Sequence, residues 1–362
     1  MTGALSAISD QMRRHSSRIG EQFAIFRISW NLWLPSRSLL APRKMPPQEH
    51  APACPVTGLP AVRHVQWVAA RLLADLWRIE FKTDARPSFC GVEMFGLWES
   101  PAGLYFFDPP LEGDRAFYVQ FYARVNAKKL FSSQAIRHEF LIASRRIEAG
   151  ARVLDVGCGF ASFRPCVPQA TYTGLDPHFA EGGAIEGVRN ETLAQHLVEH
   201  AGFYDAVCAF QVLEHVKSPA ALFAQMVQAA KPGGLIFVGV PHVPSALTRI
   251  PNFLLNAPPH HLTWWTSSAL TELANGANAV VDGIEHVPWG GHDSLIYWIE
   301  RFSPVKCTGE HFRGAWSWHA AAAFGLLGGR LAHRLLGIPA TEDEGAGLLL
   351  TARRAGQETS QP

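Results

Sequence analysis

Charged side chains are scarce in this sequence, and neither sign dominates. Only 17% of its 362 residues are Asp, Glu, Lys or Arg, and 32 basic residues against 31 acidic ones leave a formal net charge of +1. Proteins that bind nucleic acid through their overall charge carry a large basic excess. The composition therefore argues against a nucleic-acid partner, while 48% hydrophobic residues predict a folded chain.

Closely spaced cysteines and long apolar runs are also lacking. The six cysteines, at positions 54, 90, 158, 166, 208 and 307, form no Cys-x-x-Cys pair, so we expect a reducing, cytoplasmic location. The longest apolar stretch, residues 315–329, is interrupted by Ser317 and His319 and falls short of the about 20 residues that span a bilayer. Several arginines near the N-terminus argue against a secretory signal. We expect neither a transmembrane helix nor secretion.

The composition changes along the chain and predicts four parts. Residues 1–50 end in a proline-rich segment and are interpreted as an extension, with disorder as one interpretation. Within it, the basic amphipathic segment 23–34 leaves peripheral membrane contact open, although packing on the main body is commoner. Residues 51–133 are expected to form an accessory α+β region, 134–355 the main domain, and 356–362 a disordered tail.

In the accessory region, apolar spacing predicts a helix over 67–81, and residues 103–114 are expected to form a strand and then a turn. A further helix is predicted over 134–148, with Ser132 and Ser133 as candidate N-caps.

From residue 151, short apolar strands alternate with helices, which is typical of a parallel sheet. Helices are clearest over 218–231, which Pro232, Gly233 and Gly234 are expected to stop, and over 266–277, capped by Thr266. The predicted class is α/β: a mostly parallel, doubly wound sheet of seven strands, with an aromatic-rich insertion over 288–345 before the last strand. The seven strands are expected at 151–156, 170–176, 184–188, 204–210, 234–240, 279–287 and 347–353.

Two acidic residues accompany a glycine turn. The sequence VLDVGCGF (153–160) leads from a strand into Gly157 and Gly159, where the absence of Cβ atoms lets a ligand approach the backbone. Asp155 suits a ligand that carries an ammonium group, because opposite charges attract. Asp176 closes the next strand, in YTGLDP (172–177), and can accept both hydroxyls of a ribose. These features predict a nucleoside and leave nicotinamide and adenosyl cofactors open.

Two further segments, YDAVCAFQVLEHV (204–216) and KPGGLIFVGVPH (231–242), complete a series of four motifs. In this order and spacing they resemble the class I S-adenosylmethionine-dependent methyltransferases over about residues 135 to 355. The segment PPHHLTWWTSSAL (258–270) resembles the region after the fifth strand in the group that acts on sugars, quinones and other small metabolites. The resemblance implies a Rossmann-like fold and S-adenosylmethionine as cofactor.

The resemblance also implies roles for single residues. Asp155, Gly157 and Gly159 would line the methionine end of the cofactor, and Asp176 would bind its ribose. Phe210 and Gln211 would lie beside the sulfonium, although a core role for Phe210 is equally open. Ala161 stands where the family has its third glycine.

Histidine is the candidate general base, because its pKa lies near neutrality. Among the four histidines expected near the site, His261 is favoured, with His215 as the second candidate, and a structural role is open for each of them. Some quinone O-methyltransferases carry a Glu-x-x-Glu-His metal site in this region, but Gln211 occupies its first position here. We therefore predict no metal, and we interpret Glu214 as an acid at a helix N-terminus. The other two candidate histidines are His242 and His260.

Two segments, CPVTGL (54–59) and SPAGL (100–104), resemble the arms of a zinc knuckle found ahead of some sugar methyltransferases. Only Cys54 of the expected thiolates is present, so we predict a relic without zinc. The tryptophans in and before the insertion can line an acceptor pocket or fill the core.

The leading prediction is an enzyme that methylates a small-molecule acceptor, with a sugar or saccharide precursor as one candidate. A catalytically degenerate methyltransferase fold that only binds ligands stays open. A nicotinamide-dependent reductase or epimerase is less favoured, because Ser162 breaks its glycine fingerprint and no tyrosine has Lys four residues on. The sequence reveals neither the acceptor nor the oligomeric state.

Overall fold

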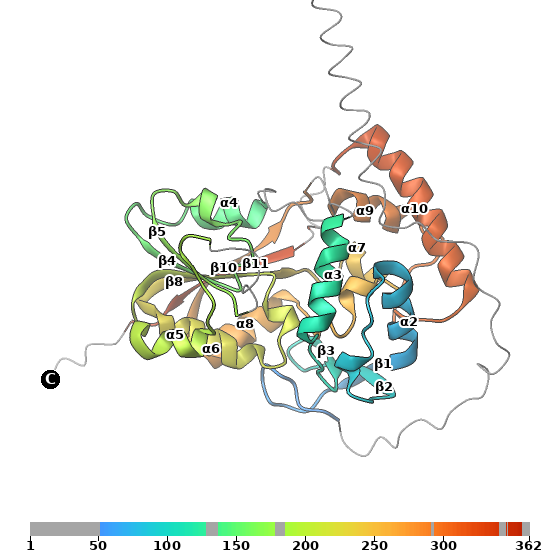
Figure 1. The fold of residues 1–362 in the computed structure, drawn as a ribbon, viewed down its shortest axis with the longest axis horizontal. Coiled ribbons are helices and arrows are strands. Elements are labelled where there is room, and N and C mark those ends of the chain that lie inside the picture. Colours follow the sequence, from blue (N-terminus) through green and yellow to red (C-terminus); the bar gives the residue numbers. More distant parts are fainter. Residues whose placement is uncertain are drawn as a thin grey trace, which may run out of the picture.

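The computed structural model describes residues 51–127, 137–177, 185–290, 293–339, 345 and 347–356, which form two β-sheets with flanking helices (Figure 1). The predictions made for residues 1–50, including segment 23–34, for Ser132 and Ser133, and for the tail beyond 356 lie outside the described residues.

The larger sheet confirms the predicted fold class. It has seven strands in the order β10-β11-β8-β7-β4-β5-β6. Only β11 runs against its neighbours, pairing antiparallel with both β8 and β10. The chain starts in the middle of the sheet, builds one half, and then returns to build the other, which is a doubly wound, Rossmann-like topology. The strands are β4 (Arg152–Val156), β5 (Thr171–Leu175), β6 (Val188–Arg189), β7 (Tyr204–Phe210), β8 (Ala230–Pro241), β10 (Ala279–Val287) and β11 (Gly347–Arg354).

Helices cover both faces of this sheet, which explains why its central strands are almost continuously apolar. In β4, Val153 packs with residues of α4 (His138–Ser144) on one face. The next residue, Leu154, packs on the opposite face with α5 (Leu193–His200), α6 (Pro219–Ala229) and α8 (Ser267–Gly276) (Figure 1). Alternate side chains of one strand thus enter two separate cores.

Several predicted boundaries were wrong. The helix predicted over 67–81 begins only at Ala70, because residues 67–69 belong to strand β1. The helix predicted over 218–231 ends at Ala229, and the residues expected to stop it, Pro232 to Gly234, lie within β8. The described part of the helix predicted over 134–148 spans only His138–Ser144. The predicted cap of α8 is confirmed, since the side chain of Thr266 accepts a hydrogen bond from the backbone N–H of Ala269.

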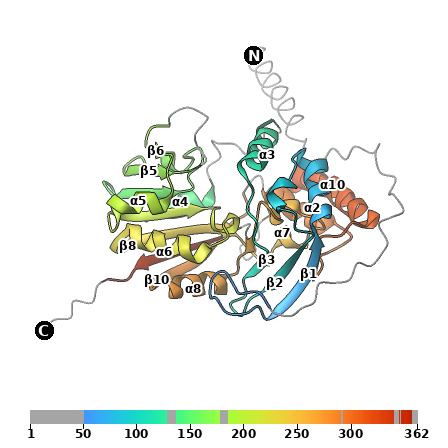
Figure 2. The same cartoon turned by 60° about the horizontal axis from the view of Figure 1, so that its bottom comes forward.

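The smaller sheet is antiparallel and joins two distant parts of the chain. Its order is β1 (Arg63–Ala69), β2 (Met94–Glu99), β3 (Tyr105–Asp108) and β9 (Thr263–Trp264). Two helices pack with it in one core, α2 (Ala70–Phe81) and α3 (Arg115–Ala127). Figure 2 shows α3 between the two sheets. Because β9 follows the fifth strand of the large sheet, the accessory region is built directly onto the segment that carries the candidate histidines.

The segment between β10 and β11 contains two helices, α9 (Asp293–Phe302) and α10 (Trp316–Leu336), which pack against each other. The tryptophans of this region divide between core and surface: Trp264, Trp265 and Trp289 are buried, whereas Trp316 is exposed. In the described part of the chain, no helix has both the length and the hydropathy needed to cross a membrane.

Candidate functional site

The glycine turn follows β4 at the carboxyl edge of the large sheet. Gly157 and Gly159 have φ angles of +68° and +51°, a region that side chains rarely adopt. A Cβ atom on Gly157 would lie 2.7 Å from Cγ2 of Val212, whereas a Cβ atom on Gly159 would meet nothing within 4 Å. Gly157 therefore allows close packing against the end of β7, and Gly159 presents an open backbone. Ala161, in place of the third glycine, also has a positive φ, of 54°.

Two carboxylates adjoin this turn. Oδ2 of Asp176 accepts a hydrogen bond of 3.0 Å from the backbone N–H of Gly159, which holds the carboxylate against the loop. Asp155 is buried, and its Oδ2 accepts a hydrogen bond of 2.7 Å from the hydroxyl of Tyr172. Burial raises the pKa of Asp155 to about 7, against the lowering effect of that hydrogen bond.

These residues fit the adenosyl cofactor that the sequence resemblance implies. The open backbone at Gly159 allows a ligand to approach the turn closely. The carboxylate of Asp176, fixed beside it, can accept hydrogen bonds from ribose hydroxyls. Asp155 is a buried carboxylate whose ionised form a ligand ammonium would stabilise.

Phe210 lies in the core, whereas Gln211 lies at the strand end where the cofactor methyl group is expected. Phe210 is buried with its ring 4.9 Å from those of both Phe140 and Phe163, measured between centroids, so it fills the core as the alternative interpretation held. Gln211 lies at the end of β7 with a φ of 59°. Its side-chain amide is 3.4 Å from Oε1 of Glu139, a buried carboxylate on α4. A strained residue at such a strand end is typical of a functional site.

Three histidines meet next to this strand end. Ring nitrogens of His215, His260 and His261, one from each, all lie within 4.8 Å of one another. The segment that carries His215 is joined to the segment of His260 and His261 by the hydrogen bond from the N–H of Leu262 to the carbonyl of Glu214, 2.7 Å long. The fourth candidate, His242, lies apart from this group, with its ring 4.6 Å from that of His286.

Hydrogen bonds fix the tautomers of two of these histidines. Nδ1 of His215 lies 2.6 Å from the carbonyl oxygen of His260 and must donate to it. Nδ1 of His261 lies 3.2 Å from Oδ1 of Asn256, whose amide group donates to the carbonyl of Leu247 and so sets the orientation of that side chain. In both histidines Nε2 is therefore the atom that can accept a proton or bind an ion.

Burial keeps all three imidazoles neutral near pH 7. It lowers the pKa of His215 to about 4 and places the pKa values of His260 and His261 well below the usual value. His215 is the most accessible of the three, with 22% of its side chain exposed.

Glu214, next to His215, is fully buried, and both of its carboxylate oxygens lack a hydrogen-bond partner among the described residues. Burial raises the pKa of Glu214 to about 8, so it is protonated at neutral pH. It belongs to a single 3-10 turn, Leu213–His215. We expected Glu214 to interact with a helix dipole at a helix N-terminus. That interaction does not explain why Glu214 is fully buried.

Sequence reasoning missed four residues of the site. Glu139 and Arg137, 3.4 Å apart, lie at the start of α4, and Asn256 orients His261. Tyr122 of α3 is exposed over 44% of its surface, and the pKa of its hydroxyl is raised, chiefly by desolvation and further by the charge of Asp176. No motif marks these residues, because each one comes from an element outside the glycine turn and the strand ends.

Metal-ligating groups were compared within the described residues. The only group of three or more there is His215, His260 and His261. Cys54, the remaining cysteine of the knuckle-like segment, is a free, buried thiol in the core with Trp98 and Leu104. The prediction of a relic knuckle stays a prediction.

Comparison with known proteins gives a family match and several similar proteins and structures. Residues 127–282 match the family described as a methyltransferase domain. The ubiquinone biosynthesis O-methyltransferase of Escherichia fergusonii is 37% identical over 100 residues, which are 24% of this chain and 42% of that protein. The protein of the same name from Escherichia coli O139:H28 gives the same values. The chain thus spans less than half the length of these curated relatives.

Among solved structures, a SAM-dependent methyltransferase from Archaeoglobus fulgidus aligns with a TM-score of 0.42 and 16% identity, covering 64% of this chain and 99% of that one. A methyltransferase from Mesorhizobium loti aligns with a TM-score of 0.35 and 20% identity, covering 59% and 95%.

Proposed function

Because residues 127–282 match a methyltransferase domain, we propose that this chain is a class I S-adenosylmethionine-dependent methyltransferase and that it methylates a hydroxyl group of a small molecule. S-adenosylmethionine supplies an electrophilic methyl carbon. The relatives from Escherichia are named for O-methylation in ubiquinone biosynthesis, which supports oxygen as the acceptor atom. A phenol of a quinone precursor and a hydroxyl of a sugar or saccharide precursor are the two acceptor classes to test first.

The residues of the glycine turn have binding roles in this proposal. Asp176 accepts hydrogen bonds from the ribose hydroxyls, and Gly159 leaves room for the ligand beside the backbone. Asp155 ionises on binding and faces the ammonium group, while Gly157 lets the end of β7 approach. Gln211, at that strand end, is proposed to lie near the methyl group, and Phe210 supports it from the core.

The observation that carries the catalytic proposal is the pair of oriented imidazoles. His215 and His261 both use Nδ1 as a donor, which leaves Nε2 as the proton acceptor. With S-adenosylmethionine bound, the cofactor would supply the methyl group to the acceptor oxygen, and Nε2 of one of these histidines would take up the proton of the acceptor hydroxyl. Burial lowers the pKa of both histidines and so makes them weaker bases than the sequence predicted. The proposal therefore rests on their neutral form and fixed orientation beside a transfer that depends mainly on positioning.

The proposed partner is a small molecule, in keeping with a net charge of +1. The six cysteines are all free, which supports a reducing, cytoplasmic setting.

Substitution of each histidine tests the base. We expect His261→Ala and His215→Ala to bind S-adenosylmethionine as the wild type does, and the variant that lacks the base to lose about 100-fold or more in methyl transfer. The measurement is release of the demethylated cofactor with a panel of phenols and sugars, alongside calorimetric titration of the cofactor. His242→Ala, outside the cluster, is the matched control. Full turnover in both cluster variants would contradict the assignment of a histidine base.

A binding module without catalysis is the second candidate. It is favoured by Ala161, which holds a side chain at a φ of 54° in the position of the third glycine. Tight cofactor binding combined with no methyl transfer to any acceptor class would support it.

A further inference from the structure

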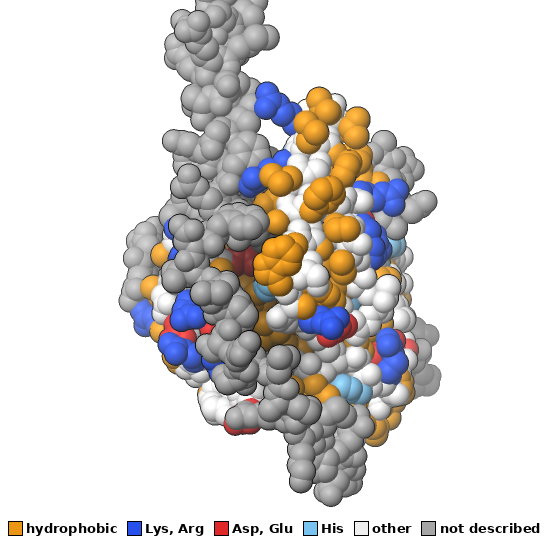
Figure 3. Space-filling view, turned by 90° about the vertical axis from the view of Figure 1, so that its right-hand side faces the viewer, with side chains coloured by type: hydrophobic (Ala, Val, Ile, Leu, Met, Phe, Trp, Pro, Cys, Tyr) orange, Lys and Arg blue, Asp and Glu red, His pale blue; other side chains and the backbone are white. Residues whose placement is uncertain are grey.

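The outer face of α10 exposes a row of large apolar side chains. Leu335 is 72% exposed and Leu327 is 67% exposed, so these side chains make few contacts within the described structure. The members follow one another at intervals of three, four or eight residues, so they share one side of the helix. Figure 3 shows hydrophobic side chains gathered on this side of the molecule. We call this row the α10 stripe; it consists of Trp316, Phe324, Leu327, Leu331 and Leu335.

The inner face of α10 combines small residues with two large buried side chains, Trp318 and Leu326. A Cβ atom on Gly329 would lie 2.6 Å from the backbone nitrogen of Ile299 in α9, and one on Gly325 would lie 2.9 Å from the carbonyl oxygen of Ile299. Helices of globular proteins normally turn their large apolar side chains inward. Here Gly325 and Gly329 make close contacts with α9. Leu326 packs in the core with Ile299, and the large side chains of the stripe point outward. Exposed apolar patches of this kind mark interaction sites, so we expect the stripe to contact an apolar surface outside the described fold.

The charges on α10 are of one sign. Over its 21 residues it has no Asp or Glu, and its charged side chains are those of Arg330 and Arg334. Arg334 is exposed next to Leu335. Arg313, just before the helix, is paired with Glu310 at 3.5 Å and adds no net charge. An apolar row flanked by basic residues is the pattern of helices that lie in the surface of an anionic bilayer.

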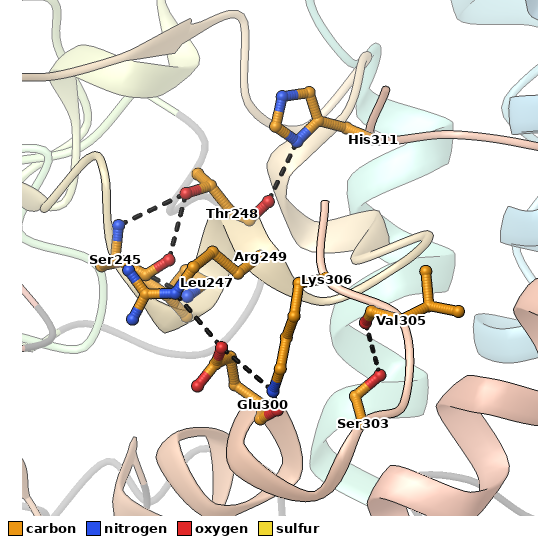
Figure 4. Close-up of polar contacts among 9 residues, drawn as sticks. All are labelled: Ser245, Leu247, Thr248, Arg249, Glu300, Ser303, Val305, Lys306 and His311. Carbon is orange, nitrogen blue, oxygen red and sulfur yellow. Dashed lines mark hydrogen bonds and ion pairs between the residues drawn. The ribbon is translucent and has the colours of Figure 1, made fainter. Parts of the chain in front are cut away.

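The α9–α10 pair is fixed to the rest of the molecule (Figure 4). The buried carboxylate of Glu300 in α9 lies 3.2 Å from Arg249 and 3.2 Å from Lys306. Arg249 ends α7 (Ala246–Arg249), and Nδ1 of His311 donates to the carbonyl of Thr248 in the same helix. The carbonyl of Leu247, also in α7, accepts a hydrogen bond from the side-chain amide of Asn256. Asn256 in turn orients His261. A surface bound through α10 is therefore rigidly linked to the candidate site.

We propose that α10 lies in the headgroup region of an anionic lipid bilayer, with the stripe inserted among the acyl chains and Arg334 among the phosphates. This goes beyond methyl transfer and does not depend on it. The binding is peripheral: one helix parallel to the surface, in the full chain. It differs from contact through residues 23–34, which lie outside the described residues.

The test is co-sedimentation of the full chain with vesicles of phosphatidylcholine alone and of phosphatidylcholine mixed with phosphatidylglycerol. We expect binding to the mixed vesicles that weakens at high salt, and at least about tenfold weaker binding of the double variant Leu327→Glu/Leu331→Glu. Arg334→Gln is expected to bind about fivefold more weakly, the contribution of one basic residue near such a surface. The matched control is Val198→Glu/Val280→Glu, which adds the same two charges at exposed apolar positions outside α10.

Three results would overturn the proposal. The first is a folded wild type that binds neither kind of vesicle. The second is equal binding by the stripe variant and the control, with binding lost on deletion of residues 1–50, since the N-terminal segment would then be the contact. The third is a wild-type dimer that the stripe substitutions convert to a monomer without any vesicle binding, which would show that a second copy covers the stripe. Circular dichroism of each variant checks that it is folded.

Discussion

At the scale of single residues, Glu214 is the least expected group of the site. Its carboxyl group is fully buried beside His215, with Nε2 of His215 at 3.9 Å from Oε1 of Glu214. An ionised carboxylate without partners in such a place would be strongly destabilising, and the group stays protonated instead.

The protonation of Glu214 has a consequence for stability. Its pKa rises from 4.5 in the unfolded chain to about 8 in the fold. The folded state therefore binds more protons between these values, and the free energy of unfolding falls as pH rises, by up to about 1.4 kcal/mol per pH unit. We expect Glu214→Gln to lose this part of the pH dependence. Thermal unfolding from about pH 5 to about pH 8 measures it.

The control is Glu272→Gln, which removes an exposed carboxylate from α8. It should keep the pH profile of the wild type. If the stability of the wild type and of Glu214→Gln changed with pH in the same way, the assignment of a raised pKa to Glu214 would be contradicted.

Gly157 gives a second prediction for a single residue. Gly157→Ala adds both a strained backbone, at a φ of +68°, and a contact of 2.7 Å with Val212. Gly150→Ala adds strain at a similar φ of +78° but meets nothing within 4 Å. We expect Gly157→Ala to lower the free energy of unfolding by about 1–3 kcal/mol more than Gly150→Ala does, in urea titrations. Equal losses would mean that the turn does not pack against β7.

The sequence could predict the site residues that sit in linear motifs, such as Gly157, Gly159 and Asp176. It could not predict Glu139, because its partner Gln211 lies 72 residues away. It could not predict Asn256 either, because its hydrogen bond to the nearby His261 belongs to no recognised motif. It predicted that His215 and His260 both lie near the site, but not the direct hydrogen bond between them, because a separation of 45 residues has no periodic signal.

At the scale of elements, the packing of α10 on α9 depends on glycine. Gly329→Ala is expected to lower the free energy of unfolding by about 1–3 kcal/mol, because its Cβ atom would meet the backbone of Ile299 at 2.6 Å. Gly276→Ala in α8, where nothing lies within 4 Å, is the matched control and should stabilise the protein by up to about 1 kcal/mol. Chemical denaturation measures both changes. A stabilising Gly329→Ala would show that the two helices are not in close contact.

The seven strands of the large sheet were predictable, because burial on both faces makes them short apolar runs between helices. The boundaries were less so. Trp67, Val68 and Ala69 fit the apolar spacing of the helix that follows them, yet they pair with β2 and belong to β1. A residue such as Ala230 gives no local sign that a helix has ended, and its pairing with Tyr204 decides the matter.

At the scale of the whole molecule, the site is assembled from three stretches of chain. The glycine turn follows β4, the strand end with Glu214 and His215 follows β7, and the pair His260 and His261 follows β8. The small sheet supports the third stretch, since Trp264 of β9 pairs with Tyr105. The sequence suggested that residues 51–133 form a region of their own. In the structure, β9 of the main region completes the small sheet that β1, β2 and β3 begin, and no local pattern predicts this pairing.

The most direct test of this account is calorimetric titration of the full chain with S-adenosylmethionine and its demethylated product. The wild type should bind both, and Asp176→Ala should lose that binding while staying folded, because the ribose loses its carboxylate. Asp282→Ala, on β10 at the opposite end of the sheet order, should bind as the wild type does. A folded wild type that binds neither compound, or an Asp176→Ala variant that binds as tightly as the wild type, would contradict the account.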